Sequence, residues 1–501
     1  MLRRLDAAAL APPLLLVAIA SMVSAPRFEV ALVGCAMAMS VLFAPRFEVL
    51  DASRGRLQRI ACVYLPIVLL GAFITAPTWM SATPFVGIDG TVNEAIIGEI
   101  VDQSAHGRPL TWATRIATGE PTLDLYPTLV HRAIAWCARA SHTEDQLTRW
   151  LGALLSLAYV AAALGMARIS YRISRNGVAA MAVGAMALLD TGSDFTWGTR
   201  PIFVYGFLPS TVTIALTMHV LPSLFDLARR QRTSTFLIST LGVAAAVGLH
   251  PLGLVIHFLL LGTLFITWLG GAPRMQKQAA LPLAAMVLGL LLTAFVWMPA
   301  ASRLLAYGVH YGTPEVRLFH ALNNMWLGVL PDGAFVPLIV LAWFGGLTFF
   351  LPKGRVEGRW IAAIAFLLIL AYVDIAFLDF GIAPSSTSVR WQSFRIGTFV
   401  KPLLYIIGGG VIGDAGRLVQ VWSDVPPLRR GIRIAAFMAF AMIAYSERDV
   451  IREGLAAQDA QRRSDMVDPA STDPEAMLAL RDYLFTELAN TPEGRAPGRL
   501  I

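Results

Sequence analysis

Acidic side chains gather in one polar segment of an otherwise apolar chain. The segment begins Gly87-Ile-Asp89-Gly-Thr-Val-Asn93-Glu94 and reaches Asp102, soon after a long apolar stretch. A carboxylate can act as a general base that takes the proton of an attacking hydroxyl group. Asp89 is the natural base by position, and Glu94 and Asp102 are weaker candidates. The structural alternatives are a turn at the Asp-Gly dipeptide and a solvated helix face for the other two carboxylates.

Cationic side chains elsewhere could bind a phosphate group. Arg390 and Arg395 precede an apolar stretch, and Lys401 lies one or two turns inside it. Arginine binds phosphate in a bidentate manner, and a lysine within a membrane helix is a functional candidate by default. The alternative for the two arginines is that they reach lipid headgroups. A second polar segment offers further groups for an acceptor or a phosphate: Arg303, His310, Tyr311, Arg317 and His320.

The composition excludes an ordinary soluble enzyme. Of 501 residues, 56% are hydrophobic and 15% are charged, whereas soluble chains carry about 25% charged residues. We therefore expect a polytopic membrane protein with one membrane domain. The net charge of +7 comes almost entirely from arginine, and we interpret it as a topology signal and not as nucleic-acid binding.

Apolar stretches predict thirteen membrane helices. A span needs roughly 20 residues, because each residue advances about 1.5 Å through about 30 Å of hydrocarbon. The first stretch could also be a signal peptide ending near Ala25, but Pro26 would be a poor first mature residue, so we expect an uncleaved anchor. The thirteen spans lie near 7–24, 29–44, 60–78, 147–167, 177–193, 201–226, 235–249, 252–269, 279–298, 333–351, 360–378, 397–413 and 431–445.

The arginine distribution predicts the orientation of these spans. Every second loop is rich in arginine, as cytoplasmic loops are, so the N-terminus is expected inside and the C-terminus outside. The outer face then holds loops 79–146, 299–332 and 379–396 together with the polar tail 447–501. The chain thus divides into an N-terminal hairpin (1–59), a membrane core (60–446) and that tail.

Two amphipathic helices are expected in the loop 79–146. Ile96, Ile97, Ile100 and Val101 form one apolar stripe, and a second amphipathic run covers 132–140. Such helices rest in the membrane interface with their polar residues in water. In the tail, another helix is expected to open at Asp473-Pro474-Glu475.

Three local patterns carry structural expectations. Asp190 and Asp194 near Arg200 suggest an ion pair that closes a loop, and the glycine run 408–410 allows close helix packing. His250 and His257 are about 10 Å apart even on one continuous helix, too far to share a metal. Because the loops expected outside also contain no Asp-x-Asp pair, we expect neither a metal nor a cofactor. The three cysteines have no disulfide or metal-binding spacing.

Several motifs in fixed order resemble the GT-C class of polytopic membrane glycosyltransferases. After a membrane span come Asp89, an amphipathic helix, Gly119-Glu-Pro121 and Tyr126-Pro-Thr-Leu129 leading into a second helix. His250-Pro251 and Gly206-Phe-Leu-Pro209 are also similar to pairs and turns of this class. The chain is close, too, to a bacterial membrane family named after 6-pyruvoyl-tetrahydropterin synthase. It departs from these relatives at Asn93, where they commonly have His, and in Tyr-Pro-Thr-Leu, where they have Tyr-Pro-Pro-Leu.

This resemblance implies an all-α GT-C-like bundle in the bacterial cytoplasmic (inner) membrane. It implies transfer of a sugar from a polyprenyl-phosphate donor to an extracytoplasmic glycan, lipid or protein acceptor, with Asp89 as base. Asn93, Glu94, Tyr126 and His250 would then join the cationic candidates in binding substrate. The alternatives are a transporter or flippase for a lipid-linked sugar, and a catalytically silent assembly partner. No half-to-half repeat of the kind that transporters show is evident.

Overall fold

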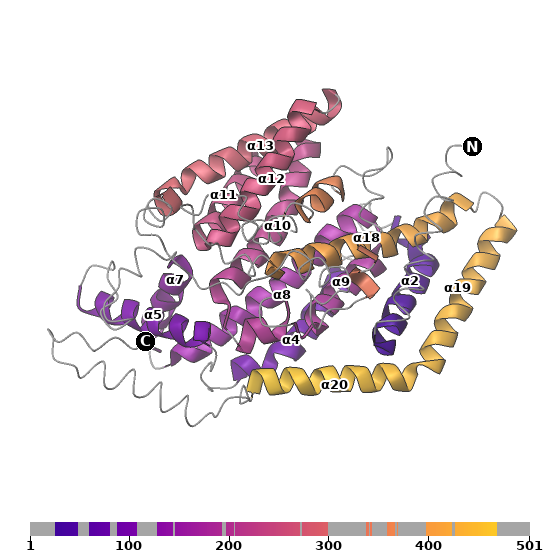
Figure 1. Ribbon diagram of the computed structural model, residues 1–501, viewed down its shortest axis with the longest axis horizontal. Helices are drawn as coiled ribbons and strands as arrows, with labels where there is room; N and C mark the ends of the chain where they lie inside the picture. The colour runs from indigo at the N-terminus through magenta and orange to yellow at the C-terminus, as the bar shows by residue number, and fades with distance from the viewer. Residues whose placement is uncertain are drawn as a thin grey trace, which may run out of the picture.

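A computed structural model of the chain describes residues 26–48, 60–80, 88–107, 128–143, 146–192, 197–204, 206–270, 273–298, 337–339, 341–342, 358–365, 368, 397–422 and 426–467. The regular structure of these residues is helical (Figure 1). The principal helices are α2 (Arg27–Glu48), α4 (Leu65–Met80), α5 (Ile88–Ala105), α7 (Leu129–Ala140), α8 (Leu147–Ser174), α9 (Gly177–Leu189), α10 (Leu208–Arg230), α11 (Thr233–Leu249), α12 (Pro251–Gly270), α13 (Pro273–Leu292), α18 (Gly397–Trp422), α19 (Pro426–Ser446) and α20 (Arg448–Val467).

Length and apolarity make several of these helices able to cross a membrane. A helix satisfies its own backbone hydrogen bonds, which is the condition for spanning lipid. Five such helices occur within the described residues, and α9 and α11 are apolar but shorter. The chain is therefore a helical membrane protein. The five are Ile60–Thr78, Leu147–Ser174, Leu208–Arg230, Gly253–Gly270 and Met275–Leu292.

The sequence-predicted spans from 147 to 298 coincide with helices α8 to α13 to within a few residues at most of their ends. The predicted spans at 29–44, 397–413 and 431–445 likewise fall in α2, α18 and α19. The span at 7–24 lies outside the described residues, and so do most of those at 333–351 and 360–378. The total of thirteen stays a prediction.

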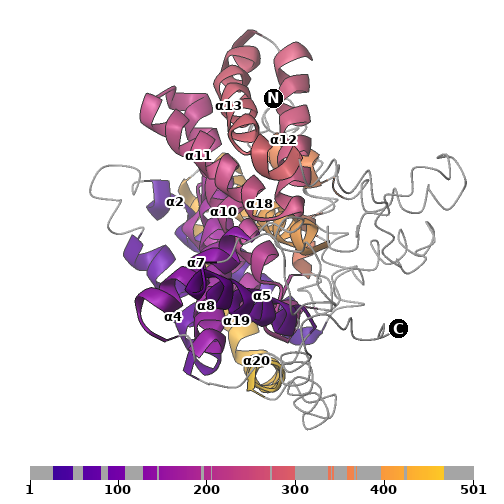
Figure 2. The ribbon, with the colours of Figure 1, turned by 90° about the vertical axis from the view of Figure 1, so that its left-hand side faces the viewer.

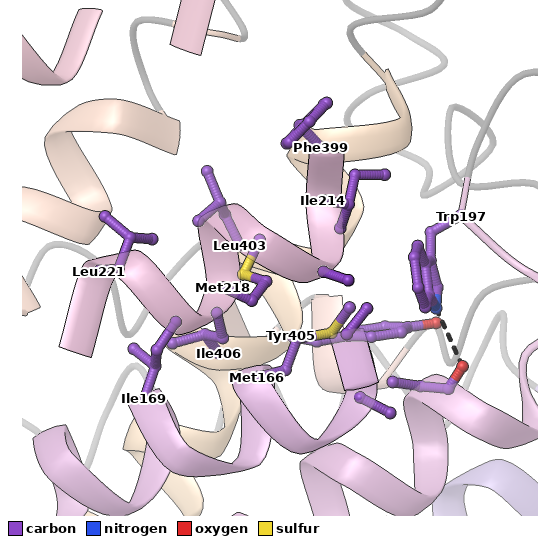
Figure 3. Close-up of a cluster of buried hydrophobic side chains, with 14 of the residues drawn as sticks. Met166, Ile169, Trp197, Ile214, Met218, Leu221, Phe399, Leu403, Tyr405 and Ile406 are labelled. Carbon is purple, nitrogen blue, oxygen red and sulfur yellow. Dashed lines mark hydrogen bonds between the residues drawn. The ribbon is translucent and has the colours of Figure 1, made fainter. Parts of the chain in front are cut away.

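Helices α8, α9, α10 and α18 form the centre of the bundle. Their side chains interlock in a cluster that includes Met166, Met218 and Leu403 (Figure 3). Around them, α4, α11, α12, α13 and α19 expose large apolar side chains; Phe73 of α4 is 66% and Leu291 of α13 is 63% exposed. Apolar exposure on this scale fits a surface that faces lipid tails.

Small residues let α18 approach its neighbours closely. A Cβ atom added to Gly408 would collide with the carbonyl oxygen of Leu338, and one added to Gly409 would collide with Val183 of α9. The prediction of close packing at 408–410 is thus confirmed at these two positions. Close approach replaces the hydrophobic driving force that helices lack inside a bilayer.

The bundle has two ends of different character. At one end, Asn176 caps α9 by accepting from the backbone amides of Val178 and Ala179. Its amide nitrogen also donates to Ser40 of α2 (2.8 Å), whose hydroxyl donates to the carbonyl of Ile412 in α18 (2.7 Å). We call this the Asn176 end. At the opposite end, which we call the α5 end, α5 and α7 pack on each other and on α8 (Figures 1 and 2).

The C-terminal polar region begins with a helix that the sequence did not predict. Helix α20 follows α19 directly and runs along the α5 end of the bundle (Figure 1). Its Gly454 lies against the ring of Phe28 at the start of α2, and Arg27 pairs with Glu447 at 3.4 Å. The first part of the expected tail is therefore docked on the bundle. The helix expected at 473–475 lies outside the described residues.

The glycine contacts predict how α18 responds to one added methyl group. Gly409→Ala should lower the free energy of unfolding by about 1–3 kcal/mol, because the methyl group overpacks the contact with α9. Gly262→Ala is the matched control, since nothing lies within 4 Å of a Cβ at that position in α12. Unfolding titrations in detergent micelles measure both, and equal stability of the two variants would contradict the packing.

Candidate functional site

A buried hydrogen-bond network fixes the first half of α5. The amide nitrogen of Asn93 donates to the carbonyl of Gly206 at 2.7 Å, and its oxygen lies 2.7 Å from Nε2 of His131 in α7. Asn93 is 4% exposed and His131 is fully buried. Three segments that are far apart in sequence are thus joined through one side chain. Asp89 lies one helical turn before Asn93 in the same helix.

The network also assigns the state of His131. Because Asn93 donates through its nitrogen, its oxygen must accept, so Nε2 of His131 carries the hydrogen. Burial lowers the pKa of His131 to about 4, so the imidazole is neutral at physiological pH. The side-chain contact that joins α5 to α7 is therefore a buried hydrogen bond between two uncharged groups.

The remaining polar residues of α5 are less solvated than the sequence predicted. Ile96, Ile97 and Ile100 are buried, as the apolar stripe requires. Glu94 accepts from the hydroxyl of Thr148 in α8 at 2.9 Å, which anchors another face of the helix. Glu99 is also buried and accepts from a glutamine one turn later. Helix α5 therefore packs into the protein on more than one side.

A second buried network holds an ion pair between α9 and α18. The carboxylate of Asp190, at the end of α9, lies 2.6 Å from the ammonium of Lys401, and the two side chains are 0% and 1% exposed. The Tyr405 hydroxyl donates to the same carboxylate oxygen at 2.8 Å, and the Gly192 amide donates to the other oxygen. Lys401 also donates to the carbonyl of Trp197 at 3.0 Å.

The chain between α9 and α10 connects the two networks. It runs from Trp197, which accepts from Lys401, through the short π-helical turn η4 (Arg200–Val204), to Gly206, which accepts from Asn93. Tyr159 of α8 packs against it: the Tyr159 ring stacks on the Trp197 ring at a centroid distance of 5.1 Å and meets the Phe203 ring edge-on at 5.6 Å. Gly206 has a φ of +74°, a backbone conformation that favours glycine. The same stretch of chain thus accepts hydrogen bonds from the ion pair at Trp197 and from α5 at Gly206.

The sequence-predicted site residues fall into two groups. Asp89, Asn93, Glu94, His250 and Lys401 lie in described helices or at their ends, with His250 buried between α11 and α12. The structure describes the backbone of Asp89 at the start of α5. The others lie outside the described residues: Tyr126, His310, Tyr311, Arg317, His320, Arg390 and Arg395.

Two of the described candidates use their polar groups within the protein. The sequence predicts Lys401 as a phosphate ligand, yet its ammonium is buried against Asp190 and Trp197. It predicts Asn93 at the substrate, yet both ends of its amide join structural elements. The expected ion pair of Asp190 does exist, but its partner comes from α18. The loop itself closes through backbone bonds from Thr199 and Arg200 to Asp190 and Thr191.

Three important residues were not selected from the sequence. His131 ends the Tyr-Pro-Thr-Leu-Val-His run, but its partner is 38 positions away, so spacing could not reveal the contact. Tyr405 follows Lys401 by one helical turn of α18, and this spacing indicates that the two side chains lie on the same face of the helix. Trp197 accepts from Lys401 through its backbone carbonyl, and because every residue has this group, the residue type could not predict the contact.

Metal ligands do not cluster in the part of the chain that the structure describes. His257 is fully buried in α12, where its Nδ1 lies 2.7 Å from the carbonyl of Gly253 in the preceding turn. This contact is local to the helix. It gives His257 a packing role within α12.

No protein-family model matches the sequence, and no curated protein matches it. One solved structure with a similar arrangement is the crystal structure of the Archaeoglobus fulgidus oligosaccharyltransferase, tethered by a disulfide bond to an acceptor peptide that contains the NVT sequon. The TM-score is 0.47 and the identity 14%, over 80% of this chain and 55% of that one. The chain thus spans about half the length of that enzyme.

The ion pair predicts an asymmetric response to substitution. Lys401→Met should lower the free energy of unfolding by about 3–5 kcal/mol, because it leaves the buried carboxylate of Asp190 without its countercharge. Adding Asp190→Asn should restore part of this loss by removing the stranded charge. Lys277→Met, at an exposed lysine of α13, is the control for loss of one positive charge. Equal stability of Lys401→Met and Lys277→Met in detergent unfolding titrations would rule out the role of the pair.

The depressed pKa of His131 predicts a pH dependence of stability. In the unfolded chain the His131 imidazole has a pKa near 6.5, whereas in the folded protein burial lowers this pKa to about 4. The contribution of neutral His131 is thus complete above pH 6.5 and is lost as the pH falls toward 4, by roughly 3 kcal/mol. Unfolding titrations across this range should show a shallower slope for His131→Gln than for the wild type. His142→Gln, at an exposed histidine, should keep the wild-type slope.

Proposed function

We propose that the protein is a membrane glycosyltransferase that moves a sugar from a polyprenyl-phosphate donor to an acceptor hydroxyl group at the α5 end of the bundle. The observation that carries this proposal is the anchoring of α5. Asn93 and Glu94 join the helix to α7, α8 and the Gly206 carbonyl. These contacts hold the part of α5 that directly follows the first turn, in which Asp89 lies. Preorganised placement of a base is a requirement of proton transfer in the transition state.

In this proposal Asp89 is the general base. The acceptor oxygen forms a bond to the anomeric carbon, the bond from that carbon to the phosphate oxygen breaks, and the phosphate leaves with the electron pair. The acceptor proton passes to the Asp89 carboxylate. Arg390 and Arg395 are the proposed ligands of the leaving phosphate. Lys401 is left out of this role because its ammonium pairs with Asp190.

The other candidates are assigned to the sugar and the acceptor. Tyr126 and His250 belong to the motifs of the loop and of the α11–α12 junction, and the segment with His310, Tyr311, Arg317 and His320 would contact the acceptor or the phosphate. The apolar tail of the donor would lie against the lipid-facing surface formed by helices such as α4 and α13. We place the α5 end on the outer face of a bacterial cytoplasmic membrane, in accord with the arginine-poor loops there.

Turnover by purified protein tests the proposal. A panel of polyprenyl-phosphate sugars is offered to the wild type and to Asp89→Asn in nanodiscs, and sugar release or transfer is measured. We expect turnover by the wild type, and in the variant a turnover rate lower by a factor on the order of 10²–10⁴. Asp449→Asn is the control, since this carboxylate is exposed on α20 at the same end of the bundle.

Two results would overturn the assignment. Wild-type turnover that survives in Asp89→Asn would remove Asp89 as the base. No turnover with any donor, combined with equal binding of lipid-linked sugar by wild type and variant, would favour a transporter or a silent assembly partner. Unfolding midpoints of all three proteins show whether the substitutions leave the fold intact.

A further inference from the structure

Arginines crowd together at the Asn176 end of the bundle, far from the proposed active site. Arg172 lies in the last turn of α8 and forms an ion pair with Asp226 of α10. The two side chains are only 17% and 22% exposed, so the pair is partly enclosed between the helices. It fixes the ends of α8 and α10 side by side.

More positive charge surrounds this ion pair. Arg175 and Arg229 lie close enough to Arg172 to repel its charge. Segments 168–175 and 226–232 together hold six arginines, and Asp226 is their single acidic residue. Asp414 adds a second carboxylate near this end, since the preceding residue, Gly413, packs on Ser174 at the end of α8. Within these two segments and at Asp414, six arginines stand against two aspartates, so this part of the described chain carries an excess of positive charge.

The depth of these arginines in the membrane can be inferred from α11, the helix that follows α10. Arg229 and Arg230 are exposed at the end of α10, and the chain turns directly into α11. Within about one turn of α11, Leu237 and Ile238 are exposed by 54% and 62%. Exposed apolar side chains mark the hydrocarbon boundary, so the arginines lie at the depth of the lipid headgroups.

We propose that the ends of α8 and α10 form a binding site for the phosphate headgroup of an anionic phospholipid. A zwitterionic headgroup carries its own cation and would gain little from the excess positive charge, whereas an anionic headgroup neutralises it. Guanidinium groups bind phosphate oxygens in a bidentate manner. Arg175 and Arg229 flank the Arg172–Asp226 ion pair and supply the contacts, while the pair holds the two helices together.

Binding of phosphatidylglycerol and phosphatidylcholine with the same acyl chains tests the site. Detergent-solubilised protein is titrated with each lipid, and the apparent Kd is obtained from the shift in thermal unfolding midpoint. The double variant Arg175→Gln, Arg229→Gln keeps the Arg172–Asp226 pair. The control Arg448→Gln, Arg452→Gln removes two exposed arginines at the opposite end. We expect the wild type and the control to prefer phosphatidylglycerol, and the first variant to bind it roughly thirtyfold more weakly.

Three outcomes would overturn the proposal. The wild type could show no preference for phosphatidylglycerol, or both double variants could lose it equally, which would indicate diffuse charge in place of a site. Inorganic phosphate at matched ionic strength could give the same stabilisation, which would assign the arginines to a free anion. Retained binding of phosphatidylglycerol by wild type and control alone supports the lipid headgroup.

Discussion

The ion pair between Asp190 and Lys401 is the interaction on which the α5 end of the bundle depends. The side chains of Asp190 and Lys401 are 0% and 1% exposed, and removing two charges from water costs free energy. The pair is stable in the core because each charged group also has further hydrogen-bond partners. The pair holds α9 against α18 and, through the Trp197 carbonyl, fixes the chain that leads into α10. That chain presents Gly206 to Asn93, so the position of α5 follows from a charge interaction in the core.

The division of labour between the two ends follows from the same principles. At the α5 end, carboxylates and neutral hydrogen bonds organise helices that lie outside the apolar spans. At the Asn176 end, the side chain of Asn176 caps α9, and the ion pair of Arg172 with Asp226 joins α8 to α10. Between the ends, small residues such as Gly409 allow helices to approach, since lipid offers no hydrophobic drive for association.

The sequence predicted what depends on local patterns and missed what depends on distant contacts. Helices from 147 to 298 were placed well because apolar length is a local property. The stripe of α5 was likewise visible, but the burial of Asn93 was not, because it requires His131 and Gly206 from two other segments. Lys401 was noticed for being charged in an apolar helix, although its partner could only be found in three dimensions. Helix α20 was missed because its polarity resembles that of an unstructured tail.

A structure determined with a non-transferable polyprenyl-phosphate sugar analogue tests the central claim most directly. We expect the phosphate and the sugar at the α5 end, with the Asp89 carboxylate about 3 Å from the position of an attacking hydroxyl oxygen. The α5 helix should keep its contacts with His131, Thr148 and the Gly206 carbonyl in that complex. A sugar bound at the Asn176 end, or at a distance that Asp89 cannot reach, would contradict the assignment of both the site and the base.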